Sequence, residues 1–168
     1  PMSGFTSLWG VTYLTKTHHL SATAAAAQSS MMWLGLALMS PFFGWLSTAL
    51  NSRRFTLISS AVMGFVSFSL LYWFELSPLI NDVLLFLAGG ACAGQAISFS
   101  SVQDNNPDAQ QATAIGFNNM AVVISGAIFQ PLIGKLIEWH AQTSNFNLLT
   151  AADLQHGILV IWLAYLFA

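Results

Sequence analysis

The chain has 168 residues, of which 55% are hydrophobic and only 6% are Asp, Glu, Lys or Arg. Soluble domains carry about 25% charged residues, so a protein of this composition cannot cover its surface with polar groups and is expected to face lipid. The formal net charge of -2 excludes a nucleic-acid partner, because such binding needs several basic side chains to neutralise phosphates.

The few charged residues divide the chain into apolar segments. Four uncharged stretches lie at 17–52, 55–74, 83–103 and 109–134. Each is long enough for an α-helix to cross the hydrocarbon core, which takes about 20 predominantly apolar residues. Runs such as 83–88 lack the alternation that strands of a membrane β-barrel require. The four stretches are therefore predicted to be transmembrane helices.

In chain order, the predicted helices alternate with short polar turns, such as Asn51 to Arg54 and Gln103 to Asp108. The first and last apolar segments are shorter than a full crossing and are predicted to be partial helices. Residues 1–168 thus form one all-α, multi-pass integral membrane unit. Its helices are predicted at 1–15, 22–50, 55–75, 79–103, 109–139 and 155–168.

An internal repeat links the second and fifth predicted helices. The tripeptide Ala-Thr-Ala at 22–24 recurs at 112–114, and the pattern Pro-x-x-Gly-x-Leu at 41–46 recurs at the same spacing at 131–136. The two helices are three apart in the series, an odd number, so they should cross the membrane in opposite directions. The sequence therefore predicts two inverted repeats of three helices, an arrangement found within the halves of transporters.

The turn after the second predicted helix resembles a loop motif of the major facilitator superfamily. That motif reads Gly, three residues, Asp, a basic residue, any residue, Gly, any residue, then two basic residues. Segment 44–54 keeps Gly44, Arg53 and Arg54 at the matching positions, and Thr48 stands where the family has Asp. The resemblance implies that this turn is cytoplasmic and helps to gate that side, although plain anchoring by the arginines is an open alternative.

Two other segments carry the same resemblance. Segment 126–134, Gly-x-x-x-Gln-Pro-x-x-Gly, looks like a helix motif of the family in which Gln130 replaces a Gly, and segment 8–14 looks like the outer end of the seventh helix of bacterial members. The family has twelve helices in two halves, and its loop motif is usually weaker in the second half. The resemblance therefore implies that the chain is the C-terminal half, helices seven to twelve, of a twelve-helix carrier in a bacterial cytoplasmic (inner) membrane.

Polar and aromatic side chains inside the predicted spans are the candidates for contact with a substrate, because burying an amide without a partner costs roughly 1–3 kcal/mol. The amides can instead bond between helices, and the aromatic rings can instead mark the membrane surface. Asn119, Gly126 and Gln130 share one helix face. The candidates are Trp9, Tyr13, Gln28, Trp33, Gln95, Asn118, Asn119 and Gln130.

Two prolines inside predicted spans are candidate hinges for alternating access. Pro41 and Pro131 each remove one helix hydrogen bond, and Gly134 follows the second of them. Proline is also tolerated in membrane helices without any motion, so a static role stays open.

The function predicted from these features is secondary active transport of a small solute by alternating access. The expected partners are the substrate, the lipid bilayer, the N-terminal half of the same carrier and a coupling proton or sodium ion. No charged residue is expected inside the four spans, so this half should present a neutral wall. The alternative is a non-transporting membrane scaffold or assembly protein. No catalytic arrangement, cofactor site or metal-ligand spacing is recognisable, so an enzyme is not expected.

Overall fold

The computed structural model describes residues 2–143 and 150–166, and every regular element in these ranges is helical. Parts of the expected helices 1–15 and 155–168, and of the connection between the last two expected helices, lie outside the described residues. The first helix consists of three consecutive pieces, α1, η1 and α2, and the fourth of two, α5 and α6. The elements are α1 (Met2–Gly4), the π-helix η1 (Phe5–Trp9), α2 (Gly10–Thr17), α3 (Ala22–Ala49), α4 (Arg53–Trp73), α5 (Pro78–Ala91), α6 (Gly94–Asp104), α7 (Asp108–Thr143) and α8 (Ala151–Leu166).

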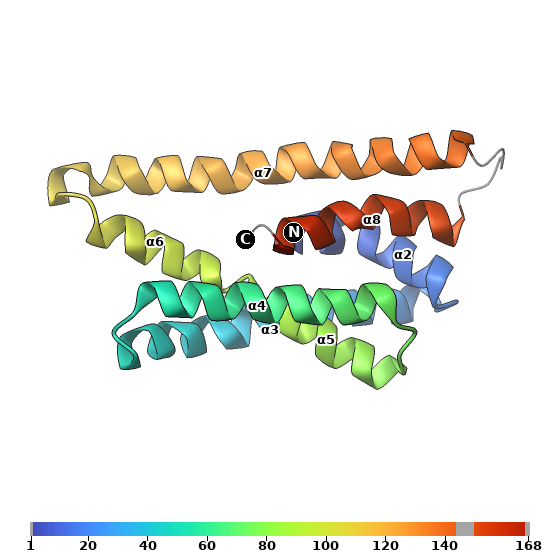
Figure 1. Ribbon diagram of the computed structural model, residues 1–168, viewed down its shortest axis with the longest axis horizontal. Coiled ribbons are helices and arrows are strands. Elements are labelled where there is room, and N and C mark those ends of the chain that lie inside the picture. The colour runs from blue at the N-terminus through green and yellow to red at the C-terminus, as the bar shows by residue number, and fades with distance from the viewer. Residues whose placement is uncertain (1, 144–149, 167–168) are drawn as a thin grey trace.

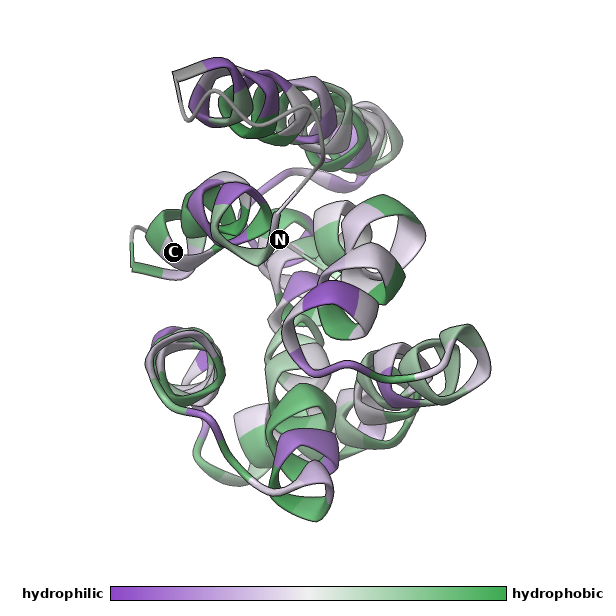
Figure 2. Cartoon of the chain, turned by 90° about the vertical axis from the view of Figure 1, so that its right-hand side faces the viewer, coloured by the Kyte–Doolittle hydropathy of each residue, from purple (hydrophilic) through white to green (hydrophobic). Residues whose placement is uncertain are grey.

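Four of these helices are long and apolar enough to cross a membrane, namely Ala22–Ala49, Arg53–Trp73, Pro78–Asp104 and Asp108–Gln142. The prediction of an all-helical protein with six helices, four of them full spans, is confirmed. Many large hydrophobic side chains are exposed, among them Trp45 at 64% and Phe117 at 68%, and the end-on cartoon shows hydrophobic residues, in green, on helices around the bundle (Figure 2). Because water would not favour such a surface, lipid is its expected surroundings.

Local sequence signals set several helix starts. The Ser21 hydroxyl accepts a hydrogen bond from the backbone N–H of Ala24 at 3.2 Å, and Ser52 accepts one from Phe55 at 3.2 Å. Each bond satisfies one of the N–H groups that the first turn of a helix leaves unpaired. Pro78 occupies the first position of α5, where its missing N–H costs nothing.

The helices lie in layers along one long axis (Figure 1). α7 forms one edge, α8 and the first helix lie next to it, and α3, α4 and α5 form the opposite side. Within the view, α3 runs from right to left and α7 from left to right. The second and fifth helices therefore run in opposite directions.

The closest helix contact joins α3 to α5 through glycine. A Cβ on Gly35 would overlap the backbone carbonyl of Phe86, and a Cβ on Gly89 would overlap the backbone of Met32. Only glycine lets two helix backbones approach this closely. Around this contact lies the core, in which Met32 and Leu85 are fully buried.

The fourth helix is interrupted at Cys92 and Ala93, between α5 and α6. The N–H groups of Cys92 and Ala93 bond to the carbonyls three residues back, on Gly89 and Gly90, both at 3.0 Å. The carbonyl of Ala88 consequently loses its usual partner, and the Tyr165 hydroxyl of α8 donates to it at 2.9 Å. The break carries no proline, whereas α3 and α7 continue unbroken through Pro41 and Pro131.

Candidate functional site

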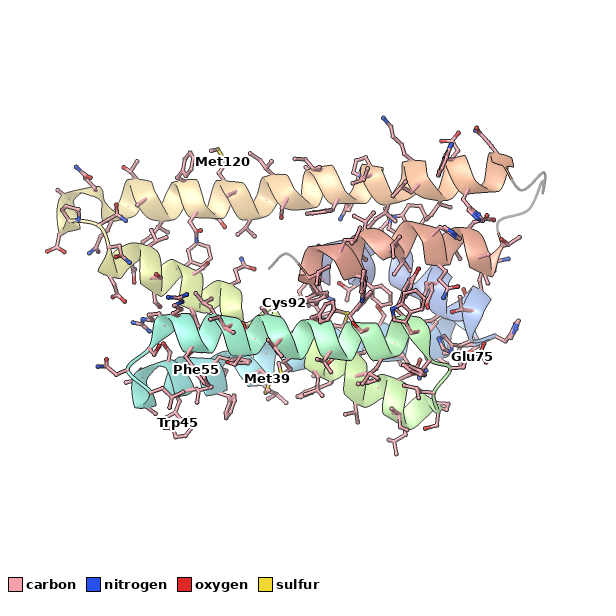
Figure 3. All side chains as sticks on the ribbon, viewed as in Figure 1. Met39, Trp45, Phe55, Glu75, Cys92 and Met120 are labelled. Atoms are coloured by element: carbon pink, nitrogen blue, oxygen red, sulfur yellow. The ribbon has the colours of Figure 1, made fainter. Side chains whose placement is uncertain are left out.

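A cavity of about 510 Å³ opens where the fourth helix is broken. All six helices contribute to its wall, which is apolar except for hydroxyl, thiol and amide groups. Cys92, at the break, lies near the centre of the molecule (Figure 3). The polar side chains of the wall are Ser60, Cys92, Gln95, Ser98, Ser125 and Tyr165.

Two of the predicted substrate contacts, Trp33 of α3 and Gln95 of α6, line this cavity together. The Trp33 side chain is 52% exposed, and Gln95 is exposed as well. Both can therefore meet a ligand without prior rearrangement of the core. An indole ring and a primary amide offer stacking and paired hydrogen bonds to a small polar solute.

Two other candidates, Tyr13 and Gln28, are packed inside the bundle away from the cavity. Tyr13 is 7% exposed and contacts the ring of Phe5 edge to face, with 6.0 Å between ring centroids. Gln28 is 8% exposed, and its Nε2 donates to the backbone carbonyl of Pro78 at 3.3 Å. In this conformation Tyr13 packs within the first helix, and Gln28 joins α3 to α5.

The three candidate amides of α7 fall into different surroundings. Asn118 donates to the hydroxyl of Ser98 at 3.3 Å and so connects α7 to α6; it also lines a second cavity of about 600 Å³ between these helices. Asn119 is exposed, and Gln130 is half-buried. Of the three, only Asn118 lies against a cavity wall among the described residues.

The ring of Trp9 lies against Gly134 of α7. A Cβ on Gly134 would come within 3.4 Å of the indole Cζ2 atom, so the glycine leaves room for the ring. Trp9 ends the π-helix, a form that often occurs at functional sites. Its indole N–H is buried and has no hydrogen-bond partner. Trp9, a predicted substrate contact, thus packs against Gly134, a predicted hinge residue.

In the loop motif, Arg53 pairs with Asp104 at the end of α6. Arg53 Nε lies 3.0 Å from Asp104 Oδ2, and Arg53 Nη1 donates to the Ser47 hydroxyl at 3.1 Å. Thr48 bonds back to the Gly44 carbonyl of its own helix at 3.2 Å. Arg54 is exposed. The acidic partner missing at Thr48 is therefore supplied by Asp104, which no local motif indicated.

Two carboxylates within helices have buried oxygen atoms, Asp82 in one of the four spans and Asp153 in the last helix. Asp82 lies near the start of α5, within the helix predicted at 79–103, and its Oδ1 is buried without a partner. Asp153 in α8 is fully buried: its Oδ1 lies 2.6 Å from His140 Nδ1, and its Oδ2 accepts from the Thr150 N–H and hydroxyl at 2.8 and 2.6 Å. The charge-free stretch 83–103 suggested a span without charged residues, but the fourth helix begins at Pro78 and therefore includes Asp82.

Among residues 2–143 and 150–166, no group of three or more His, Cys, Asp or Glu side chains could hold a metal ion. The imidazoles of His140 and His156 are stacked, with 3.8 Å between ring centroids. This arrangement brings the ring faces together, whereas two ligands of one ion would direct their nitrogen lone pairs at a common point.

The sequence matches the profile of the Major Facilitator Superfamily over residues 2–164. No curated protein and no solved structure gives a significant match. The profile therefore spans the long cavity-lining helices α3, α4 and α7 and the turn before Arg53. Proteins of this family are transporters and typically not enzymes.

Proposed function

Because the chain belongs to the major facilitator superfamily, we propose that it forms one half of a secondary carrier that moves a small solute across a membrane by alternating access. Family membership makes the protein an integral membrane protein with a role in membrane transport. The observation that carries the finer proposal is the cavity, whose wall is built by all six helices and holds Trp33 and Gln95.

Two inverted repeats of three helices are part of this proposal. The opposite directions of α3 and α7 (Figure 1) support it, as does the recurrence of the pattern at 41–46 in 131–136. In such carriers, one structural unit rocks against another around a fixed site near the middle of the membrane. Pro41, Pro131 and Gly134 are the candidate hinges.

We assign the chain to the C-terminal half, helices seven to twelve, of a carrier in a bacterial inner membrane. The degenerate loop motif supports this assignment, with Arg53 paired to Asp104 and Thr48 bonded within α3. The N-terminal half would then cover part of the exposed apolar surface of α3 and α7, to which Trp33 and Val123 belong.

The substrate is a small solute that needs no charged group from this wall. The cavity offers hydroxyls, an amide and an indole ring, groups that suit amino acids, nucleosides, sugars or drug-like solutes. Trp33 and Gln95 are the first contacts to test. Trp9, Tyr13, Gln28, Asn118, Asn119 and Gln130 remain secondary candidates, and a proton or a sodium ion is the candidate coupling ion.

The test is uptake into proteoliposomes that hold the full carrier, in which this chain is joined to its N-terminal half, first with a panel of radiolabelled amino acids, nucleosides and sugars. For the solute that is taken up, Gln95→Leu should lower the rate about fivefold, because a lost hydrogen bond is worth about 1 kcal/mol. Its matched control is Gln142→Leu, at the exposed end of α7, which should leave uptake unchanged. Equal rates for the two variants at equal protein content would remove Gln95 from the site, and absence of uptake across the whole panel would count against the carrier.

A further inference from the structure

Four of the five buried side-chain atoms that lack a hydrogen-bond partner in the described residues lie near the amino ends of α3 and α5. They are Gln28 Oε1, Ser29 Oγ, Asn81 Oδ1 and Asp82 Oδ1. Gln28, Ser29 and Asn81 are 8%, 4% and 2% exposed. All four atoms are oxygens, and buried oxygens in native proteins nearly always have a partner.

The geometry of the α3–α5 contact places Gln28 beside Pro78, about one turn before the level of Asp82. The two helices touch where Gly35 meets the carbonyl of Phe86. Asp82 is one turn before Phe86, and Gln28 is two turns before Gly35. The bond from Gln28 to the Pro78 carbonyl at 3.3 Å shows that the helices stay in contact there. Pro78 and Asp82 share one face of α5, since they are four residues apart.

The hydrogen bonds of the Gln28 and Asn81 side chains determine which amide atom lacks a hydrogen-bond partner. Gln28 Nε2 donates to the carbonyl of Pro78, and Asn81 Nδ2 donates to that of Leu76 at 3.4 Å. Turning either amide over would set its oxygen against a carbonyl oxygen. Both amide oxygens are therefore held away from these carbonyls, as acceptors without a donor.

Ser29 differs from its neighbours on α3. The hydroxyls of Ser30 and Ser40 donate to carbonyls four residues back, at 2.8 and 2.6 Å, which is the usual way for a serine in a membrane helix to be satisfied. Ser29 makes no such bond. Its lone pairs are consequently available to a ligand.

The charge of the cluster suits a single positive ion. Asp82 supplies one carboxylate and the other three groups are neutral, and within the described residues Asp82 makes no ion pair. The partial positive charge at the amino end of α5 falls off within the first turn, and Asp82 is the fifth residue of that helix. Carboxylate, amide and hydroxyl oxygens are ligands for hard cations.

We propose that Gln28 and Asp82, with Ser29 and Asn81 beside them, bind one sodium ion between α3 and α5. One carboxylate neutralises a monovalent ion, whereas divalent ions are usually held by more acidic groups. Any coupling of this ion to solute movement rests on the proposed carrier function, but the binding itself does not.

The test measures binding of ²²Na⁺ to the purified protein in lipid nanodiscs by scintillation proximity, with choline chloride keeping the ionic strength constant. The wild-type protein should bind ²²Na⁺ saturably, and unlabelled sodium chloride should displace it. Asp82→Asn should lower binding at least tenfold at subsaturating ²²Na⁺. The matched control Asp108→Asn removes the same charge from an exposed site at the start of α7 and should bind within twofold of wild type.

A second pair of variants tests the ion site if Asp82→Asn does not fold. Gln28→Leu should lower binding at least threefold, whereas Gln142→Leu should not change it. Absence of saturable binding to the wild type, or equal binding by each variant and its control, would overturn the site and leave water or a proton on Asp82 as the occupant. Saturable ²²Na⁺ binding without uptake of any solute would count against the proposed carrier and leave the ion site standing.

Discussion

The fourth and fifth helices follow one another in the sequence and are both apolar enough to cross a membrane, yet they are packed in opposite ways. In its most apolar window, 50% of Pro78–Asp104 is buried, against 11% of Asp108–Gln142. α5 contacts α3 through glycine, whereas α7 presents side chains such as Met120 outward (Figure 3). Apolar composition brings a helix into the membrane, but it does not decide whether lipid or protein surrounds it.

The two helices also differ in how they depart from regularity. The fourth breaks at Cys92 without a proline, and the fifth continues through Pro131. The break is supported from outside, since α8 provides the Tyr165 hydroxyl for the freed carbonyl of Ala88. An irregular backbone at membrane depth persists where neighbouring protein satisfies it, and the fourth helix has such neighbours on several sides.

The largest contrast between the helices is expected from adding a side chain to a glycine of each. Gly89→Leu should lower the free energy of unfolding by at least about 3 kcal/mol, because the new Cβ would overlap the Met32 backbone. Gly116→Leu in α7, where nothing lies within 4 Å of the added Cβ, should stabilise slightly through helix propensity. Denaturation of both variants in detergent measures the two changes in unfolding free energy. Similar losses in both variants would contradict the contrast between the two helices.

A smaller effect is expected at the break itself. Tyr165→Phe removes the hydroxyl that donates to the Ala88 carbonyl, and it should cost about 1 kcal/mol of unfolding free energy. Hydrogen exchange should also become faster between Ala88 and Ala96. Tyr72→Phe removes a hydroxyl from a half-buried ring of α4 far along the chain from the break and serves as the control. Unchanged exchange at the break in Tyr165→Phe would show that α8 does not support it.

The smallest effect should come from the outer face of α7. Val123 is 63% exposed, so Val123→Ala should change the unfolding free energy of the 168-residue chain by less than about 0.5 kcal/mol. Denaturant titration in detergent is sufficient to measure it. A loss above about 1 kcal/mol would mean that another protein surface already covers this face in the purified chain.

Much of the fold was predictable because it depends on short-range properties. Charge-free stretches of sufficient length gave four spans, and Ser21 and Ser52 cap helices where serine is expected to do so. The fourth helix shows the limit of this reasoning. The helix begins at Pro78, one residue before the predicted start at 79, and so includes Asp82, which lies outside the charge-free stretch 83–103.

The candidate site was less predictable, because the type of a residue does not reveal which other atoms its side chain contacts. Trp33 and Gln95 line one cavity, but Gln28 and Tyr13, chosen by the same criterion, are packed between helices. Arg53 was found through its motif, whereas its acidic partner Asp104 is 51 residues further along the chain. No signal within the loop could have identified it.

By itself, the sequence determined that this protein is helical and lies in a membrane, since hydropathy, helix length and capping act within a few neighbouring residues. Only the tertiary structure decided where the fourth helix breaks, which glycine admits another backbone, and which oxygens are buried without a donor. These features depend on atoms of distant helices, whose approach is set by packing and hydrogen bonding across the whole bundle.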